Sequence, residues 1–150
     1  RVLNFGWACA DAVISSGAVL RAEPEVVYRT QFEDLVAYRR TTLQRERTHP
    51  LQVIFTMTGN VDVQSHPVFT TPGVEAVLFT GRAGWETLAA RVYQSTIPMT
   101  LRAGQTAHRL RDRAVTIIPL DRIEDLSCAL RVLHCDFGIR YAEVDSGSTL

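Results

Sequence analysis

Small residues, hydroxyl groups and one guanidinium follow three short apolar runs of this chain, at positions where a phosphorylated ligand could be held. In chain order these residues are Gly17 and Ala18; Thr80, Gly81 and Arg82; and Ser146, Gly147, Ser148 and Thr149. Small residues let backbone N–H groups come close to a phosphate, and an arginine can hold a phosphate through two parallel hydrogen bonds. Each junction alone is more typical of an ordinary tight turn. Taken together, the three junctions predict a nucleotide site.

Such a site needs strands that end at a common edge, and the hydrophobic pattern predicts them. Short apolar runs rich in Val, Ile and Phe predict strands at 10–14, 51–56, 74–80, 115–119 and 139–145. Helical spacing of apolar residues predicts helices at 31–45, 84–93 and 122–137. Several strand runs are continuously apolar, which is typical of strands covered on both faces. We therefore expect a three-layer α/β domain with a mostly parallel central sheet.

The clearest predicted helix spans residues 122–137. Asp121 stands at its N-cap position with Glu124 three residues later, a pattern typical of a capping box. Gly138 follows the last apolar residue as a natural C-terminal stop. The segments 60–72 and 98–113 are poorly patterned and are expected to be loops or short turns. No repeat or linker divides the chain, so we expect one domain over residues 1–150.

Composition narrows the classes of protein. The 150 residues carry 16 basic and 16 acidic side chains, and a formal net charge of zero argues against a dedicated nucleic-acid surface. Every basic residue is arginine, which excludes a Schiff-base lysine or a P-loop in this stretch. No apolar run approaches the roughly 20 residues of a membrane span. Three cysteines, none in a CxxC motif, predict a reducing intracellular compartment, cytoplasmic or organellar (mitochondrion or plastid).

Two other kinds of site are considered and not favoured. Cys128, His134 and Cys135 share the predicted helix 122–137, but their spacing suits zinc poorly, so no metal site is expected and thiols in a helix core are the better interpretation. The arginine-rich stretches at 39–47 and 109–113 have acidic residues among or near them. They are expected to form a mixed, solvated surface.

Several segments of the chain resemble a known family. Residues 10–13 (Ala-Asp-Ala-Val) and 17–24 (Gly-Ala-Val-Leu-Arg-Ala-Glu-Pro) are similar to its first strand–turn pattern, and residues 144–150 to its valine-glutamate-glycine-glycine-proline-threonine-leucine ending. The runs at 50–55 and 74–82 fall where two further family strands belong. The family is the riboflavin-biosynthesis reductase domain, the C-terminal half of the bacterial bifunctional deaminase-reductase. The resemblance implies a dihydrofolate-reductase-like fold.

The resemblance also implies an activity, namely NADPH-dependent hydride transfer that reduces the ribose of a phosphorylated ribosylamino-pyrimidine to ribityl. Gly17 and Ala18 would lie beside the pyrophosphate and nicotinamide end of NADPH, and residues 146–149 would form a second phosphate-facing turn. The junction at Thr80 would lie near the adenosine ribose, with Arg82 as a partner of the 2′-phosphate.

On the substrate side, Glu23 and Pro24 match the family's acidic-proline pair. No catalytic residue is assigned within this chain. In this chemistry the cofactor supplies the hydride, and the protein mainly positions and polarises.

The chain departs from the family pattern in both segments. Ala18 stands where the family has threonine, and the approach to Gly17 is one residue shorter. The family's glutamate-glycine-glycine-proline is here Asp145, Ser146, Gly147 and Ser148. A Cβ at Ser146 occupies space that a close backbone-to-phosphate approach needs. These departures favour a second hypothesis, a non-catalytic reductase-like pseudoenzyme that serves as a structural subunit of a larger assembly.

The resemblance further implies that the domain is incomplete within this chain. The first and last family strands would lie outside residues 1–150. We therefore expect further residues of the same protein, or a partner chain in an oligomer, to complete the sheet, because an uncovered sheet edge favours aggregation.

Overall fold

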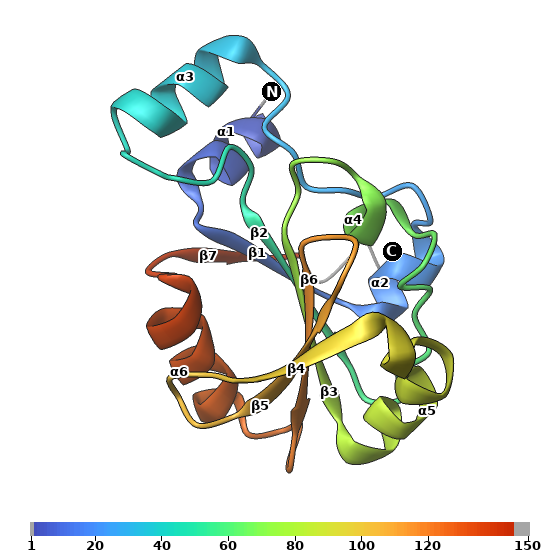
Figure 1. Ribbon diagram of the computed structural model, residues 1–150. Helices are drawn as coiled ribbons and strands as arrows, with labels where there is room; N and C mark the ends of the chain where they lie inside the picture. Colours follow the sequence, from blue (N-terminus) through green and yellow to red (C-terminus); the bar gives the residue numbers. More distant parts are fainter. Residues whose placement is uncertain (1, 146–150) are drawn as a thin grey trace.

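A seven-stranded sheet forms the centre of the computed structural model, which describes residues 2–145 (Figure 1). The strand order is β4-β5-β6-β3-β2-β1-β7. The five strands from β6 to β7 are parallel, and β4 and β5 are antiparallel to their neighbours. The strands are β1 (Ala12–Ser16), β2 (Leu51–Thr56), β3 (Ala76–Gly81), β4 (Thr96–Thr100), β5 (Thr106–Leu110), β6 (Val115–Leu120) and β7 (Ala142–Val144). The predicted three-layer α/β class with a mostly parallel sheet is confirmed.

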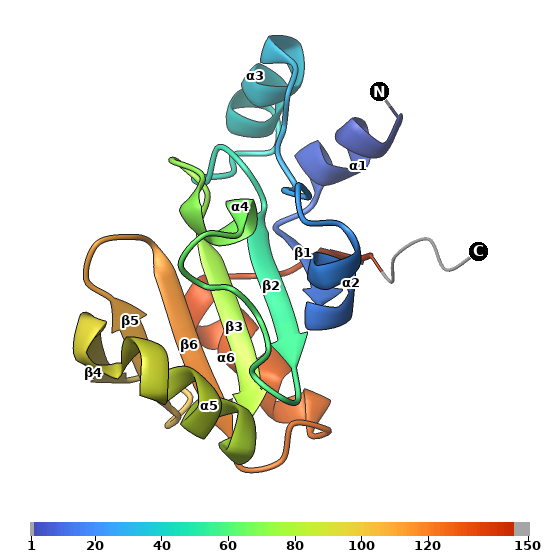
Figure 2. The same cartoon turned by 90° about the vertical axis from the view of Figure 1, so that its right-hand side faces the viewer.

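Helices cover both faces of the sheet (Figure 2). One face carries α2 (Gly17–Ala22), α4 (Pro67–Thr70) and α5 (Arg82–Val92), the last continued by the 3-10 turn η1 (Tyr93–Ser95). Leu20, Phe69 and Leu88 from these helices pack on Ile54 and Leu78 of the strands. The other face carries α6 (Leu126–Phe137). No helix of residues 2–145 is long and apolar enough to cross a membrane.

Two further helices lie together beyond the amino ends of the strands (Figure 1). They are α1 (Val2–Cys9), which the sequence analysis did not predict, and α3 (Glu33–Thr41), which is shorter than the predicted 31–45. Their contact is fixed from α3 by Arg39, whose guanidinium reaches the backbone carbonyls at the end of α1.

The predicted start of the last helix is wrong by four residues. Asp125, not Asp121, caps α6, because its side chain accepts a hydrogen bond from Cys128 N at 3.3 Å. Residues 121–125 instead form a turn after β6, closed by the bond from Asp125 N to Arg122 O. The predicted stop at Gly138 is confirmed, since this residue has the left-handed conformation (φ 69°) that favours glycine.

The predicted loop at 98–113 is wrong, because this segment contributes strands to the β4–β5 hairpin. Four of the five β4 residues are exposed on the sheet edge, so no apolar alternation marks the strand. Residues 60–72 are irregular as predicted, apart from the single turn of α4. Within residues 2–145, β4 and β7 form the two edges of the sheet. Completion of the sheet by other residues or a partner chain stays a prediction.

Candidate functional site

The carboxyl ends of the parallel strands bring the predicted junctions to one edge of the sheet. β1 runs into Gly17, and β3 runs into Arg82. β7 lies directly beside β1, and Asp145 N donates a hydrogen bond of 2.8 Å to Ile14 O at its end. β2 lies between β1 and β3, which separates the first two junctions by about 10 Å. The third predicted junction, Ser146, Gly147, Ser148 and Thr149, lies outside the described residues.

The first junction exposes only one of its two predicted residues. Ser16 caps α2 by accepting a hydrogen bond of 3.3 Å from Val19 N, which fixes the turn. Gly17 is buried, and a Cβ added to it would lie 3.0 Å from Val61 Cγ1. The Val61 side chain therefore already fills the space beside Gly17. Ala18 is exposed and is the member of the pair that a ligand could reach.

The second junction presents one largely exposed cation, Arg82. Thr80 is fully buried, and its hydroxyl has no hydrogen-bond partner among the described residues. Gly81 is the N-cap of α5 and provides no side chain to cap it. The Arg82 side chain is 78% exposed and lies 3.6 Å from the even more exposed Asp121, a pairing that solvent weakens. Arg82 is therefore available to an anionic group.

The loop after β2 covers the edge between these junctions. Gly59 has a φ of +69°, and a Cβ there would lie 2.2 Å from Gly84 O in the first turn of α5. A Cβ on Gly84 would in turn lie 2.8 Å from Met57 O. Two backbones therefore meet without side chains between them, and the loop closes over the ends of β2 and β3.

Tyr28 joins the ends of β1 and β7, a contact that the sequence analysis missed. Its buried hydroxyl donates to Asp145 Oδ2 at 2.7 Å and lies 3.2 Å from Ser15 Oγ. Burial raises the pKa of Tyr28 above its ordinary value, and the charges of Asp145 and Glu23 raise that pKa further. A carboxylate is thus held at the end of β7, close to the first junction.

Gln52, near the start of β2, positions the backbone of Tyr28. Its Oε1 accepts a hydrogen bond from Tyr28 N, and its Nε2 donates to Tyr28 O, both at 2.9 Å. A third bond of 2.7 Å from Nε2 reaches Pro50 O. The fully buried amide therefore fastens a segment without regular structure onto the sheet.

Glu23 and Pro24, the predicted substrate residues, lie in different surroundings. Glu23 ends α2, its N–H donates to Val19 O, and its charge acts on Tyr28. Pro24 lines a cavity of about 520 Å³ between α2 and residues 60–67. His66 also lines this cavity; its Nδ1 accepts from Val68 N at 3.2 Å, and its Nε2 has no partner among the described residues.

We expect the Tyr28→Phe variant to lose the hydrogen bond to Asp145 at every pH and, in addition, to change how stability depends on alkaline pH. The folded-state pKa of Tyr28 is raised above 10.0. The protonated Tyr28 therefore makes its full contribution to the free energy of unfolding below about pH 10, and this contribution falls by roughly 1.4 kcal/mol per pH unit as the pH rises further. In urea unfolding, the free energy of unfolding of Tyr28→Phe should fall less at alkaline pH than that of the wild type. The control Tyr93→Phe, altered at an exposed ring, should show the same alkaline fall as the wild type. Parallel pH curves for wild type and Tyr28→Phe would contradict the assignment.

Comparison with known proteins identifies a similar solved structure. No family model matches the chain, and no curated protein matches its sequence. A crystal structure of a pyrimidine reductase-like protein from Corynebacterium diphtheriae has a TM-score of 0.58 and 15% sequence identity, covering 92% of this chain and 50% of that chain. The two chains share a fold. The present chain spans about half the length of that pyrimidine reductase-like protein.

The described residues fit a nucleotide cofactor in part. Exposed Ala18 and largely exposed Arg82 stand at one edge of the sheet. Gly17 fits less well, because Val61 already fills the space beside it. No group of three or more His, Cys, Asp or Glu residues within residues 2–145 could hold a metal ion.

Proposed function

We propose that the chain is a reductase domain that uses NADPH to reduce a phosphorylated ribosylamino-pyrimidine. The observation that carries this proposal is the adjacency of β1 and β7. It brings the end of β1, which runs into the first junction, beside Asp145 after β7, in a sheet whose fold is similar to that of a pyrimidine reductase-like protein. Ligands of open α/β sheets bind at this edge. Bound NADPH supplies the hydride.

The chain's own residues would bind and orient the reactants. We assign the first junction at Ala18 and the turn at 146–149 to the pyrophosphate and nicotinamide end, and Arg82 to the 2′-phosphate. An arginine suits this last role because its planar guanidinium can bind two phosphate oxygens together. Asp145, held by Tyr28 beside the end of β1, would orient the substrate from the same side as Glu23.

The second candidate function is a non-catalytic, structural domain that assembles with other protein subunits. Two observations favour it. Gly59 in the loop at 57–63 packs directly on Gly84 of α5, so this loop covers the carboxyl ends of β2 and β3. Ala18 has no hydroxyl to offer a phosphate.

Calorimetric titration of the protein in its full length with NADPH and NADH separates the two candidates. We expect NADPH to bind more tightly, and Arg82→Gln to weaken NADPH about tenfold while leaving NADH unchanged, since one charge-assisted contact of about 1.4 kcal/mol is lost. Arg131→Gln, an exposed arginine on α6, is the matched control. No binding at about millimolar NADPH would overturn the reductase proposal and favour the structural domain.

A further inference from the structure

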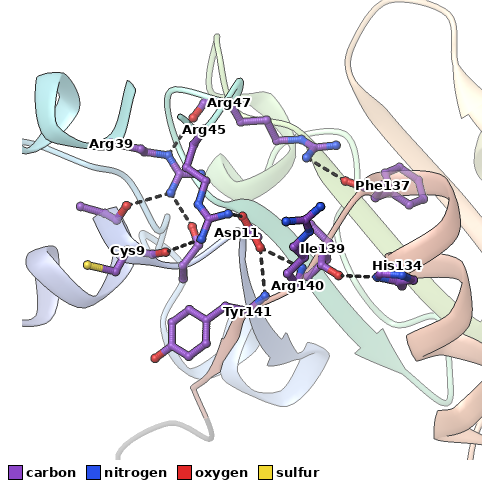
Figure 3. Close-up of polar contacts among 12 residues, drawn as sticks. Cys9, Asp11, Arg39, Arg45, Arg47, His134, Phe137, Ile139, Arg140 and Tyr141 are labelled. Atoms are coloured by element: carbon purple, nitrogen blue, oxygen red, sulfur yellow. Dashed lines mark hydrogen bonds and ion pairs between the residues drawn. The ribbon is translucent and has the colours of Figure 1, made fainter. Parts of the chain in front are cut away.

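A second polar cavity lies at the opposite end of the strands, where the proposed function does not use it. It measures about 380 Å³ and opens between the segment after α3, the start of β1 and the end of α6. Figure 3 shows the side chains around it, drawn from elements that are far apart in the sequence. Its charged lining consists of Asp11, Arg39, Arg45, Glu46, Arg47 and Arg140. Four cations therefore face two anions.

Arg39 and Asp11 are fixed by contacts within the protein and form the base of this cavity. Arg39 is only 1% exposed and donates to the backbone carbonyls of Ala8, Ala10 and Arg47. Burial, and next the positive charge of Arg45, lower the pKa of Arg39 to about 10. The expectation of a solvated surface at 39–47 is thus wrong for Arg39. Like charges crowd one another at this base, and a bound anion would relieve that repulsion.

Asp11 holds the other side of the base. Its Oδ2 accepts hydrogen bonds from Arg140 N at 2.8 Å and Tyr141 N at 2.9 Å, and its Oδ1 pairs with Arg45 Nη1 at 2.7 Å. These three contacts occupy the carboxylate and fix the backbone from which the Arg140 side chain projects (Figure 3). Asp11 therefore neutralises Arg45, and Glu75 pairs with Arg47, whereas Arg39 and Arg140 have no ion-pair partner within residues 2–145.

Three guanidinium groups keep donors that the described residues do not satisfy. Arg45 Nε is buried without a hydrogen-bond partner among those residues. Arg47 uses Nε for Glu75 at 2.8 Å and Nη1 for Phe137 O at 3.0 Å, and its Nη2 makes no such bond within residues 2–145. The exposed guanidinium of Arg140 makes no hydrogen bond or ion pair there. An unsatisfied buried donor costs free energy, so Arg45 gains by turning toward an anion.

We propose that this cavity binds a phosphorylated small molecule through its phosphate group. Phosphate is the anion that best fits several converging guanidinium groups, because it offers three terminal oxygens and a charge near −2. The cavity volume lies within the range of small-ligand sites and exceeds what one phosphate needs, so it leaves room for an organic part.

This second site is independent of the carboxyl edge of the sheet to which we assign NADPH, called the cofactor edge below. Asp11 stands at the amino end of β1, and the five residues of that strand place the cofactor edge about 16 Å away. A failure of NADPH binding would therefore leave this site untouched.

Calorimetric titration of the protein with inorganic phosphate and with pyrophosphate tests the proposal. We expect both to bind, with a dissociation constant of about 1 mM or lower for pyrophosphate. Arg140→Gln should weaken binding about tenfold, because it removes an exposed charge while the backbone N–H that Asp11 needs remains. Arg131→Gln, equally exposed on α6, should bind as wild type does.

A second variant keeps the result specific to this cavity. Arg82→Gln alters the cofactor edge alone, so phosphate binding here should not change in it. Binding that falls with Arg82→Gln but not with Arg140→Gln would overturn the proposal and place the anion at the cofactor edge. Absence of binding to the wild-type protein at about 10 mM pyrophosphate would overturn it as well.

Discussion

Replacing Arg39 by alanine is expected to lower the free energy of unfolding by about 3–5 kcal/mol. The guanidinium is buried and donates to three backbone carbonyls, those of Ala8, Ala10 and Arg47. Alanine would leave these acceptors without partners at a position that water does not reach, and buried unsatisfied groups carry their full desolvation cost. It would also release α3 from the end of α1.

Arg40 provides a matched control for this experiment. It has the same chemistry on the same helix, one residue further along, but it is exposed. Arg40→Ala should therefore change stability by no more than about 0.5 kcal/mol. Urea unfolding followed by circular dichroism measures both variants, and similar losses in the two would show that the Arg39 contacts do not stabilise the fold.

Replacing Gly59 by alanine is expected to cost about 2–4 kcal/mol. Two effects add at this position. The backbone has a φ of +69°, which an L side chain adopts with strain, and the new Cβ would lie 2.2 Å from Gly84 O, a backbone atom that cannot turn aside. Either the loop or the first turn of α5 must move, and Arg82 moves with α5.

Gly73 separates the two effects. It has a similar φ of +78°, but an added Cβ would meet nothing within 4 Å. Gly73→Ala should therefore show the conformational cost alone, about 1–2 kcal/mol. The difference between the two variants, measured by thermal unfolding, is the cost of the close approach. Equal losses would show that the loop adapts without strain.

The fold could be predicted from the sequence where burial leaves a pattern. β2 lies on the predicted residues 51–56, because a strand covered on both faces is apolar throughout. β4 could not be predicted in the same way, since its edge position leaves Ile97 and Met99 exposed and places Pro98 between them. The start of α6 was predicted wrongly because Asp121 and Glu124 have the capping-box pattern, whereas Asp125, which lacks that pattern, caps the helix.

The candidate site was predictable only in its local part. The turn at Gly17 follows β1 as predicted, because strand and turn are neighbours in sequence. The Tyr28 hydrogen bond to Asp145 joins residues 117 positions apart, and Tyr28 lies in a segment with no periodicity. Arg39 was hidden for a related reason. The next residue, Arg40, is an exposed arginine on the same helix, so nothing in the local sequence shows that the Arg39 guanidinium is buried.

The adjacency of β1 and β7 has a consequence for the order in which the protein is made. The bond from Tyr141 N to Asp11 at the start of this strand pair spans 130 positions. Closing so long a loop is entropically costly, and parallel neighbours cannot pair through a short hairpin. A nascent chain that has not yet reached Tyr141 can pair β1, β2, β3 and β6 but lacks the β1–β7 pair. The candidate site therefore forms only after the chain has passed Tyr141, later than the part of the sheet that supports it.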